Sequence, residues 1–223
     1  MILDEYCIEN ALVCFRNPDV VAVIPSEEKV CHTYLEKIQV NWFIGNANPF
    51  RTGIGISSFA EFFRKDIFKE ISFDPNLGLG EDDDFQSRLK ILIKDSQKIV
   101  NANESKIFAH HPHNLKELYS RWVWWGRTAL TYLRKNPAPN VVLNFASDIS
   151  PTILLILAIT FPFLFGGIIW GVLFVLPSIA RSTIACYRSR SYYLLEFLFY
   201  DYIRSLFFTY GLLQGLFKTA RGR

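Results

Sequence analysis

A run of residues without any charged side chain, from Ile149 to Ala180, most constrains how this chain can fold. As one helix, the stretch 151–180 would be about 45 Å long, well beyond the roughly 30 Å hydrocarbon core of a bilayer. A pair of buried core helices in a soluble protein is the alternative, but an uncharged run of this length is typical of membrane segments. The run therefore predicts that the chain enters a bilayer.

The sequence allows two arrangements of this segment. Either one long, tilted helix crosses the bilayer, or the chain breaks at Gly166 and Gly167 into a hairpin whose arms are each about 22 Å long. The hairpin is favoured because it leaves Arg181 on the same side as Arg134 and Lys135. Basic residues collect on the cytoplasmic side of membrane segments.

A second apolar segment, 192–217, carries charged residues that include Asp201 and Arg204. Charges within a membrane span are costly unless they face protein or pair with each other. The segment is therefore either an amphipathic helix at the interface or a span in which Asp201 and Arg204 pair against a neighbour. Gly211 and Gly215 form a GxxxG spacing that could seat another helix.

Charge and cysteine spacing exclude two other classes of protein. The small net charge of +3 comes from basic residues near the C-terminus, so the chain lacks the clustered basic face of a nucleic-acid binder. The four cysteines have neither CxxC spacing nor a histidine at zinc-ligand distance. This pattern predicts free thiols in a reducing compartment.

Upstream of the membrane region, short apolar strands alternate with helices. The pattern predicts strands at 20–24, 57–63 and 106–110, and helices at 29–39 and 115–133. This alternation is typical of an α/β fold.

The change in composition divides the chain into two regions. Residues 1–135 form the α/β region and residues 136–223 the membrane region, with a transmembrane segment at 151–180 and a transmembrane or interfacial helix at 192–217.

Four consecutive acidic residues, Glu81 to Asp84, follow a glycine-rich turn and precede apolar residues at helical spacing. They are therefore expected in the first turn of a helix. Acidic groups there complement the helix dipole, and Asp84 can pair with Arg88 one turn later. The sharper interpretation is a catalytic base, because adjacent carboxylates repel and raise the proton affinity of at least one of them.

The order of these elements resembles the acceptor-side half of family 2 (GT-A type) glycosyltransferases. In that family an Arg-rich strand end is followed by the dipeptide "F(D/E)", here Phe73-Asp74, and then by a helix that begins "GED-x-D-(L/F)-x-x-R". Here the matching residues are Gly80, Glu81, Asp82, Asp84, Phe85 and Arg88. Downstream, His110-His111-Pro112, Arg121-Trp122 and Trp125-Gly126-Arg127 are similar to the family's later region, although Leu118 replaces the usual Gln of QxxRW.

The resemblance implies roles for individual residues in an inverting sugar transfer. Asp82 would be the general base that deprotonates the acceptor hydroxyl, and Glu81 would position the acceptor or tune that base. Arg88 would hold the acidic cluster. The other residues expected at the substrate are Asp83, Asp84, Arg121, Trp122, Trp125 and His110.

The resemblance also implies what surrounds the chemistry. The donor would be a nucleotide sugar or a polyprenyl-phosphate sugar, and the acceptor a lipid or a glycan. The fold would be a partial GT-A (Rossmann-like) domain whose catalytic part lies on the cytoplasmic side of the cell membrane. The family's nucleotide-binding half, with the DxD that holds Mg²⁺ or Mn²⁺, has no counterpart in these residues, so we expect this chain alone to be inactive. A non-catalytic membrane scaffold that keeps the fold is the alternative.

Overall fold

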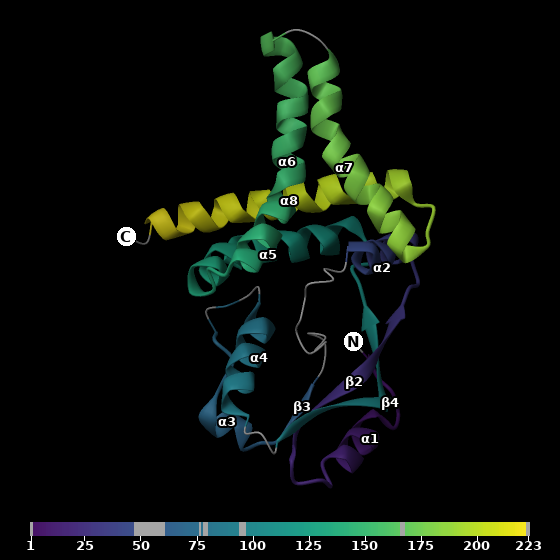
Figure 1. Ribbon diagram of the computed structural model, residues 1–223, viewed down its shortest axis with the longest axis vertical. Coiled ribbons are helices and arrows are strands. Elements are labelled where there is room, and N and C mark those ends of the chain that lie inside the picture. Colours follow the sequence, from purple (N-terminus) through teal and green to yellow (C-terminus); the bar gives the residue numbers. More distant parts are fainter. Residues whose placement is uncertain are drawn as a thin grey trace. The chain divides into compact units, whose positions relative to one another are not determined.

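The computed structural model describes residues 2–46, 61–75, 77, 80–93, 97–165 and 168–221. It divides into two compact units. The first comprises the described parts of Met1–Cys31, Pro49–Pro75 and Gly80–His111, and the second those of His32–Asn48, Asn76–Leu79 and Pro112–Arg223. The chain is a mixed α/β protein, with a four-stranded sheet in the first unit and helices in the second (Figure 1).

The sheet of the first unit has the strand order β1-β4-β2-β3. Its two long strands, β2 (Val20–Val30) and β4 (Lys98–His110), are parallel, whereas β1 (Ile2–Leu3) and β3 (Phe62–Phe63) pair antiparallel at the two sides. The start of β2 is buried because it reads Val-Val-Ala-Val-Ile without a polar residue. An apolar strand buried on both faces is typical of parallel pairing.

Three helices belong to the sheet unit: α1 (Cys7–Cys14), α3 (Ile67–Glu70) and α4 (Glu81–Leu92). Helix α4 packs on the sheet through Phe85 and Leu89, which are fully buried with Val21, Ala22 and Ile67.

The predicted elements of this region are confirmed in part. The strands at 20–24 and 106–110 exist, but both are longer than expected. The predicted helix at 29–39 is wrong at its start, because Lys29 and Val30 pair with β4 and the helix α2 begins only at Tyr34. Of the predicted strand at 57–63, residues 57–60 lie outside the described residues.

The second unit consists of α2 (Tyr34–Asn46), α5 (Leu115–Lys135), α6 (Pro139–Phe165), α7 (Ile168–Ser189) and α8 (Leu194–Arg221). Its core is rich in aromatic side chains, among them Trp42, Trp122, Phe197 and Phe208. The predicted helix at 115–133 is confirmed as α5.

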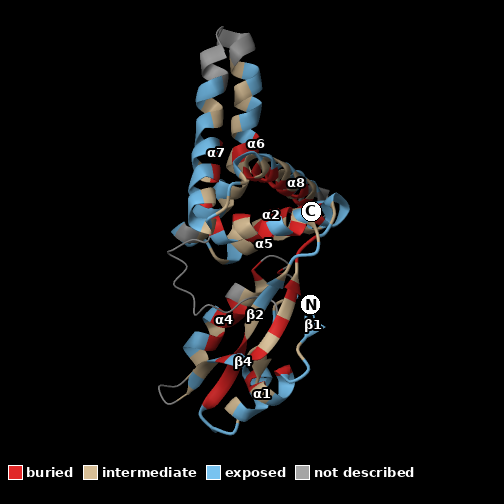
Figure 2. Ribbon diagram, turned by 90° about the vertical axis from the view of Figure 1, so that its right-hand side faces the viewer, coloured by how far each residue is buried: buried red, intermediate tan, exposed pale blue. Residues whose placement is uncertain are grey.

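A helical hairpin is confirmed, because α6 and α7 run side by side and Phe161 packs edge-on against Phe174 (Figures 1 and 2). The expected break at Gly166 and Gly167 lies outside the described residues, and entry of the hairpin into a bilayer stays a prediction. The expected arm length of about 22 Å is wrong. Helix α6 starts at Pro139 and has 27 residues, and α7 has 22, which gives arms of about 40 and 33 Å. Residues 139–148, upstream of the uncharged run, already belong to α6. Composition alone could not mark where this helix starts, because these residues include polar and charged ones.

Within the described residues, one stretch, Val141–Phe161, is long and apolar enough to cross a membrane, and most of it is exposed. Figure 2 shows exposed residues along both arms of the hairpin, whereas buried residues gather on the helices at its base.

Helices α5 and α8 pack with their backbones in close contact. A Cβ on Gly126 would overlap the carbonyl of Phe208, and one on Gly211 would overlap the carbonyl of Val123. Gly215 likewise faces Arg127. The GxxxG spacing therefore seats α5, as the sequence allowed.

Candidate active site

The acidic run lies in the first turn of α4, as predicted, and Gly80 sets its start. Gly80 has φ 75° and ψ 20°, a left-handed conformation that glycine adopts without the steric cost of a Cβ. The N–H of Asp84 donates to the carbonyl of Gly80 at 3.0 Å, which closes the first helical turn. Glu81 and Asp82 therefore occupy the positive end of the helix dipole.

Asp84 and Arg88 form the ion pair that their spacing allows. Asp84 is buried, and its Oδ2 accepts from Arg88 Nε at 2.9 Å and lies 2.7 Å from Nη2. Arg88 Nη2 also donates to the carbonyl of Ser72 at 2.7 Å. Arg88 thus ties the helix to the segment before it and neutralises Asp84, which gives this carboxylate a structural explanation.

Four phenylalanines hold the start of α4 in place. The ring of Phe85 stacks on Phe73 with centroids 4.3 Å apart, and it meets Phe63 edge-on at 5.1 Å. Phe68 completes the cluster. These ring contacts hold the backbone of the first turn of α4 in place, and with it the carboxylates of that turn.

Glu61 is a residue of this site that the sequence interpretation missed. It is half-buried beside β3, and the pKa of its carboxyl is raised to about 7, first by burial and then by the negative charge of Asp82. Within the described part of the chain, its Oε1 is buried without a hydrogen-bond partner. A carboxylate inside the apolar sequence Phe-Ala-Glu-Phe-Phe was the available signal, because burying an unpaired charge is costly.

The remaining residues of the acidic run differ in exposure. Glu81 and Asp82 are half-buried, and the side chain of Asp83 lies outside the described residues. His110 ends β4, where it pairs in register with Val30 and is half-buried.

Arg121, Trp122 and Trp125 lie on α5 in the helical unit. Trp122 is buried, stacks on Phe43 with centroids 6.4 Å apart and meets Trp125 edge-on at 4.7 Å. Packing therefore explains Trp122, and its role with a substrate stays a prediction.

Unlike Trp122, Arg121 is not explained by packing. Its guanidinium is half-buried and forms no hydrogen bond or ion pair with any residue that the structure describes. Burial lowers its pKa. An unpaired arginine in a partly desolvated position is suited to bind a phosphate or carboxylate.

The predicted residues thus fall into two sets. Those on α4, with His110, belong to the sheet unit, and those on α5 belong to the helical unit. The structure brings Asp82 together with Glu61, and Asp84 together with Arg88.

The Mg²⁺ or Mn²⁺ that the resemblance implies for the full-length family has no set of ligands in the described part of the chain. No three His, Cys, Asp or Glu side chains there gather around a point that could hold an ion.

The chain was compared with known proteins. No model of a protein family matches it, and no curated protein sequence does.

Proposed function

We propose that this chain, although inactive alone, takes part in inverting sugar transfer at a membrane as the acceptor-side part of the catalytic site, with Asp82 as the base that takes the proton from the acceptor hydroxyl. The observation that carries the proposal is the start of α4. There Arg88 neutralises the buried Asp84, while Asp82 remains beside the partly desolvated Glu61.

The proposed chemistry needs one ionised carboxylate next to the acceptor. The hydroxyl oxygen attacks the anomeric carbon of the donor sugar, the bond from that carbon to the phosphate breaks, and the hydroxyl proton passes to Asp82. With a pKa of about 7, Glu61 holds a proton in mildly acidic solution. Glu61 then adds no second negative charge beside Asp82.

Arg121 is the proposed partner of the donor phosphate. A guanidinium forms charge-assisted, often bidentate hydrogen bonds with phosphate oxygens, and desolvation strengthens them. Arg121 feels the charge of Glu117 one turn earlier on α5, but it forms no hydrogen bond or ion pair with any described residue, which supports this role. The donor is a nucleotide sugar or a polyprenyl-phosphate sugar, because both carry the sugar on a phosphate.

The helical unit supports a location in the cell membrane. The stretch Val141–Phe161 is mostly exposed and apolar. Arg134 and Lys135 end α5 just before α6 begins, and Arg181 of α7 donates to the carbonyl of Ser147 near the start of α6. Basic residues at the base of a membrane hairpin favour the cytoplasmic side for the rest of the chain. The acceptor is then a lipid or a membrane-associated glycan.

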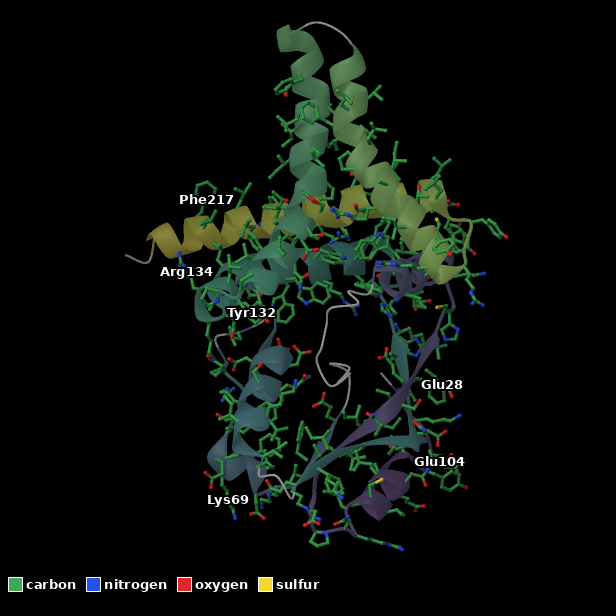
Figure 3. The ribbon with its side chains drawn as sticks, viewed as in Figure 1. Glu28, Lys69, Glu104, Tyr132, Arg134 and Phe217 are labelled. Atoms are coloured by element: carbon green, nitrogen blue, oxygen red, sulfur yellow. The ribbon has the colours of Figure 1, made fainter. Side chains whose placement is uncertain are left out.

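The test is Asp82→Asn in membranes from cells that produce the chain. Transfer of radiolabelled sugar into the lipid and glycan fractions is measured with a panel of donors. We expect a loss of about 100- to 10,000-fold, the usual contribution of general-base catalysis. The matched control is Glu104→Gln, which neutralises an exposed carboxylate of the same unit (Figure 3) and leaves transfer unchanged.

Two outcomes would count against the proposal. Transfer at the unaltered rate by a folded Asp82→Asn variant removes Asp82 as the base. Absence of any transfer that depends on the unaltered chain favours the non-catalytic scaffold.

A further inference from the structure

Helix α8 carries an exposed apolar face along most of its length. Phe199 and Phe217 are each 68% exposed, and Leu195 is 75% exposed. Spacings of three, four and seven residues place side chains on one side of a helix. The outer face of α8 consists of Leu195, Phe199, Leu206, Tyr210, Leu213, Leu216 and Phe217.

Contacts on the opposite side of α8 hold the helix in an orientation that leaves this face exposed. Arg204 and Phe208 are buried there, and Gly211 is in backbone contact with α5. Thr152 of α6 is held by Ser205 of α8, with the two hydroxyl oxygens 2.8 Å apart. Rotating α8 to hide the apolar face would break all of these contacts, so the face needs a partner from outside the unit.

The direction of the hairpin indicates what that partner is. Within the helical unit α8 crosses the base of α6 and α7 (Figures 1 and 2). Figure 3 shows Phe217 projecting from α8 on the side from which the hairpin rises, whereas Arg134 lies on the other side of α8. The outer face of α8 and the exposed apolar surface of the hairpin thus turn to the same side, and one hydrophobic medium can cover both.

The turn between α7 and α8 adds the groups that a lipid headgroup layer attracts. Arg188 and Arg190 are exposed, as are Tyr187 (86%) and Tyr192 (100%), and together they line an open pocket. Tyrosine rings and arginines concentrate at membrane–water interfaces, where anionic lipids attract the positive charge.

We propose that α8 lies in the plane of one membrane leaflet, with its outer face in the acyl-chain layer, and that the hairpin enters the bilayer from the same leaflet. Helices of this kind bury their apolar face about 5–10 Å below the headgroup boundary. A crossing by α8 is disfavoured because its inner face is already packed on α5. The inference is independent of the proposed sugar transfer.

The experiment measures the depth of single fluorescent labels in vesicles. Cys14, Cys31 and Cys186 are replaced by serine, and the buried Cys7 is left. Single cysteines at Phe199, Leu206 or Leu213 are then coupled to an environment-sensitive dye. The full chain is reconstituted in vesicles of phosphatidylcholine and phosphatidylglycerol that contain lipids with a quencher on the acyl chain or on the headgroup.

We expect acyl-chain quenching of similar size at all three positions of α8, because an in-plane helix keeps one depth. A label at Ser120, which is exposed on α5, is the matched control and should escape acyl-chain quenching. A label at Ile156 of α6 should be quenched most strongly by acyl-chain quenchers.

Three outcomes would overturn the proposal. A label at Leu206 that lies much deeper than those at Phe199 and Leu213 means that α8 crosses the bilayer. Three unquenched α8 labels beside a quenched Ile156 label mean that something other than lipid, such as a second copy of the chain, covers the face. An unquenched Ile156 label means that the hairpin does not enter the membrane.

Discussion

Helices α4 and α8 each contain an Asp–Arg pair, but the two pairs lie in different surroundings. In α4 the pair is Asp84–Arg88, with side chains that are 6% and 35% exposed. In α8 it is Asp201–Arg204, with exposures of 0% and 1%. The same residue types, one helical turn apart, thus occur partly exposed in the sheet unit and fully buried in the helical unit.

The buried pair belongs to a closed set of interactions. Arg204 donates to Asp201 Oδ1 at 2.7 and 3.0 Å and to Asp148 Oδ1 at 2.6 Å, and Asp201 Oδ2 also accepts from Arg181 at 3.3 Å. The Arg204 guanidinium lies over the ring of Trp42 at 4.2 Å. Two positive and two negative groups balance, so the cluster ties α8 to both arms of the hairpin and leaves no charge over.

The pair in α4 belongs to an open set. Among the described residues Arg88 bonds to Asp84 and to the carbonyl of Ser72, and Asp82 of the same helix interacts with Glu61. Removing one member of a fully buried charge cluster leaves an uncompensated buried charge, whereas a half-buried carboxylate such as Asp82 can take a proton from a substrate.

The largest expected effect comes from breaking the buried cluster with Arg204→Met. The variant leaves Asp201 and Asp148 without their main partner, and we expect a loss of about 3–5 kcal/mol in the free energy of unfolding. Chemical denaturation in detergent micelles, followed by tryptophan fluorescence, measures it.

The matched substitution in the open set is Arg88→Met, for which we expect a loss of about 1–2 kcal/mol, because solvent reaches that pair. Equal losses for the two variants would contradict the distinction between a closed and an open set.

An intermediate effect is expected for Gly211→Ala on the inner face of α8. The added Cβ would overlap the carbonyl of Val123, so α5 and α8 must move apart, at a cost of about 1–3 kcal/mol. The control is Leu213→Ala on the outer face, which should change stability in detergent by no more than about 0.5 kcal/mol. A Gly211→Ala variant as stable as the unaltered chain would mean that the close helix contact does not form.

The smallest effect is expected for Glu61→Gln, and it depends on pH. The folded state raises the pKa of Glu61 from 4.5 to about 7, so the folded chain binds more protons than the unfolded chain between these values. Stability from this group is present below pH 4.5 and is lost as the pH rises to about 7.

Because solvent screens part of the charge on Glu61, we expect this loss to be about 1 kcal/mol. Unfolding curves measured across this pH range should show the slope for the unaltered chain and a smaller slope for Glu61→Gln. An unchanged slope in the variant would assign the pH dependence to another group.

The sequence predicted the acidic first turn of α4 and the long helix α5 because both depend on local patterns. A glycine stands before the run of carboxylates, and Phe85 and Leu89 follow at helical spacing. This local pattern is enough to place the start of α4 at Glu81. The sequence analysis missed the start of α6 at Pro139 because the helix begins about ten residues before the uncharged run. Absence of charge marks only the part of the helix beyond Asp148.

The sequence by itself determined the mixed α/β composition and the place of the acidic run, and it favoured the hairpin over one long helix, since periodicity, glycine and uncharged length are properties of neighbouring residues. Only the tertiary structure decided which charges are free to act. Glu61 meets Asp82 from about twenty residues away in the chain, and Arg204 meets Asp148 from 56 residues away. Such encounters depend on how elements pack, because burial and the distance between charges are set by folding.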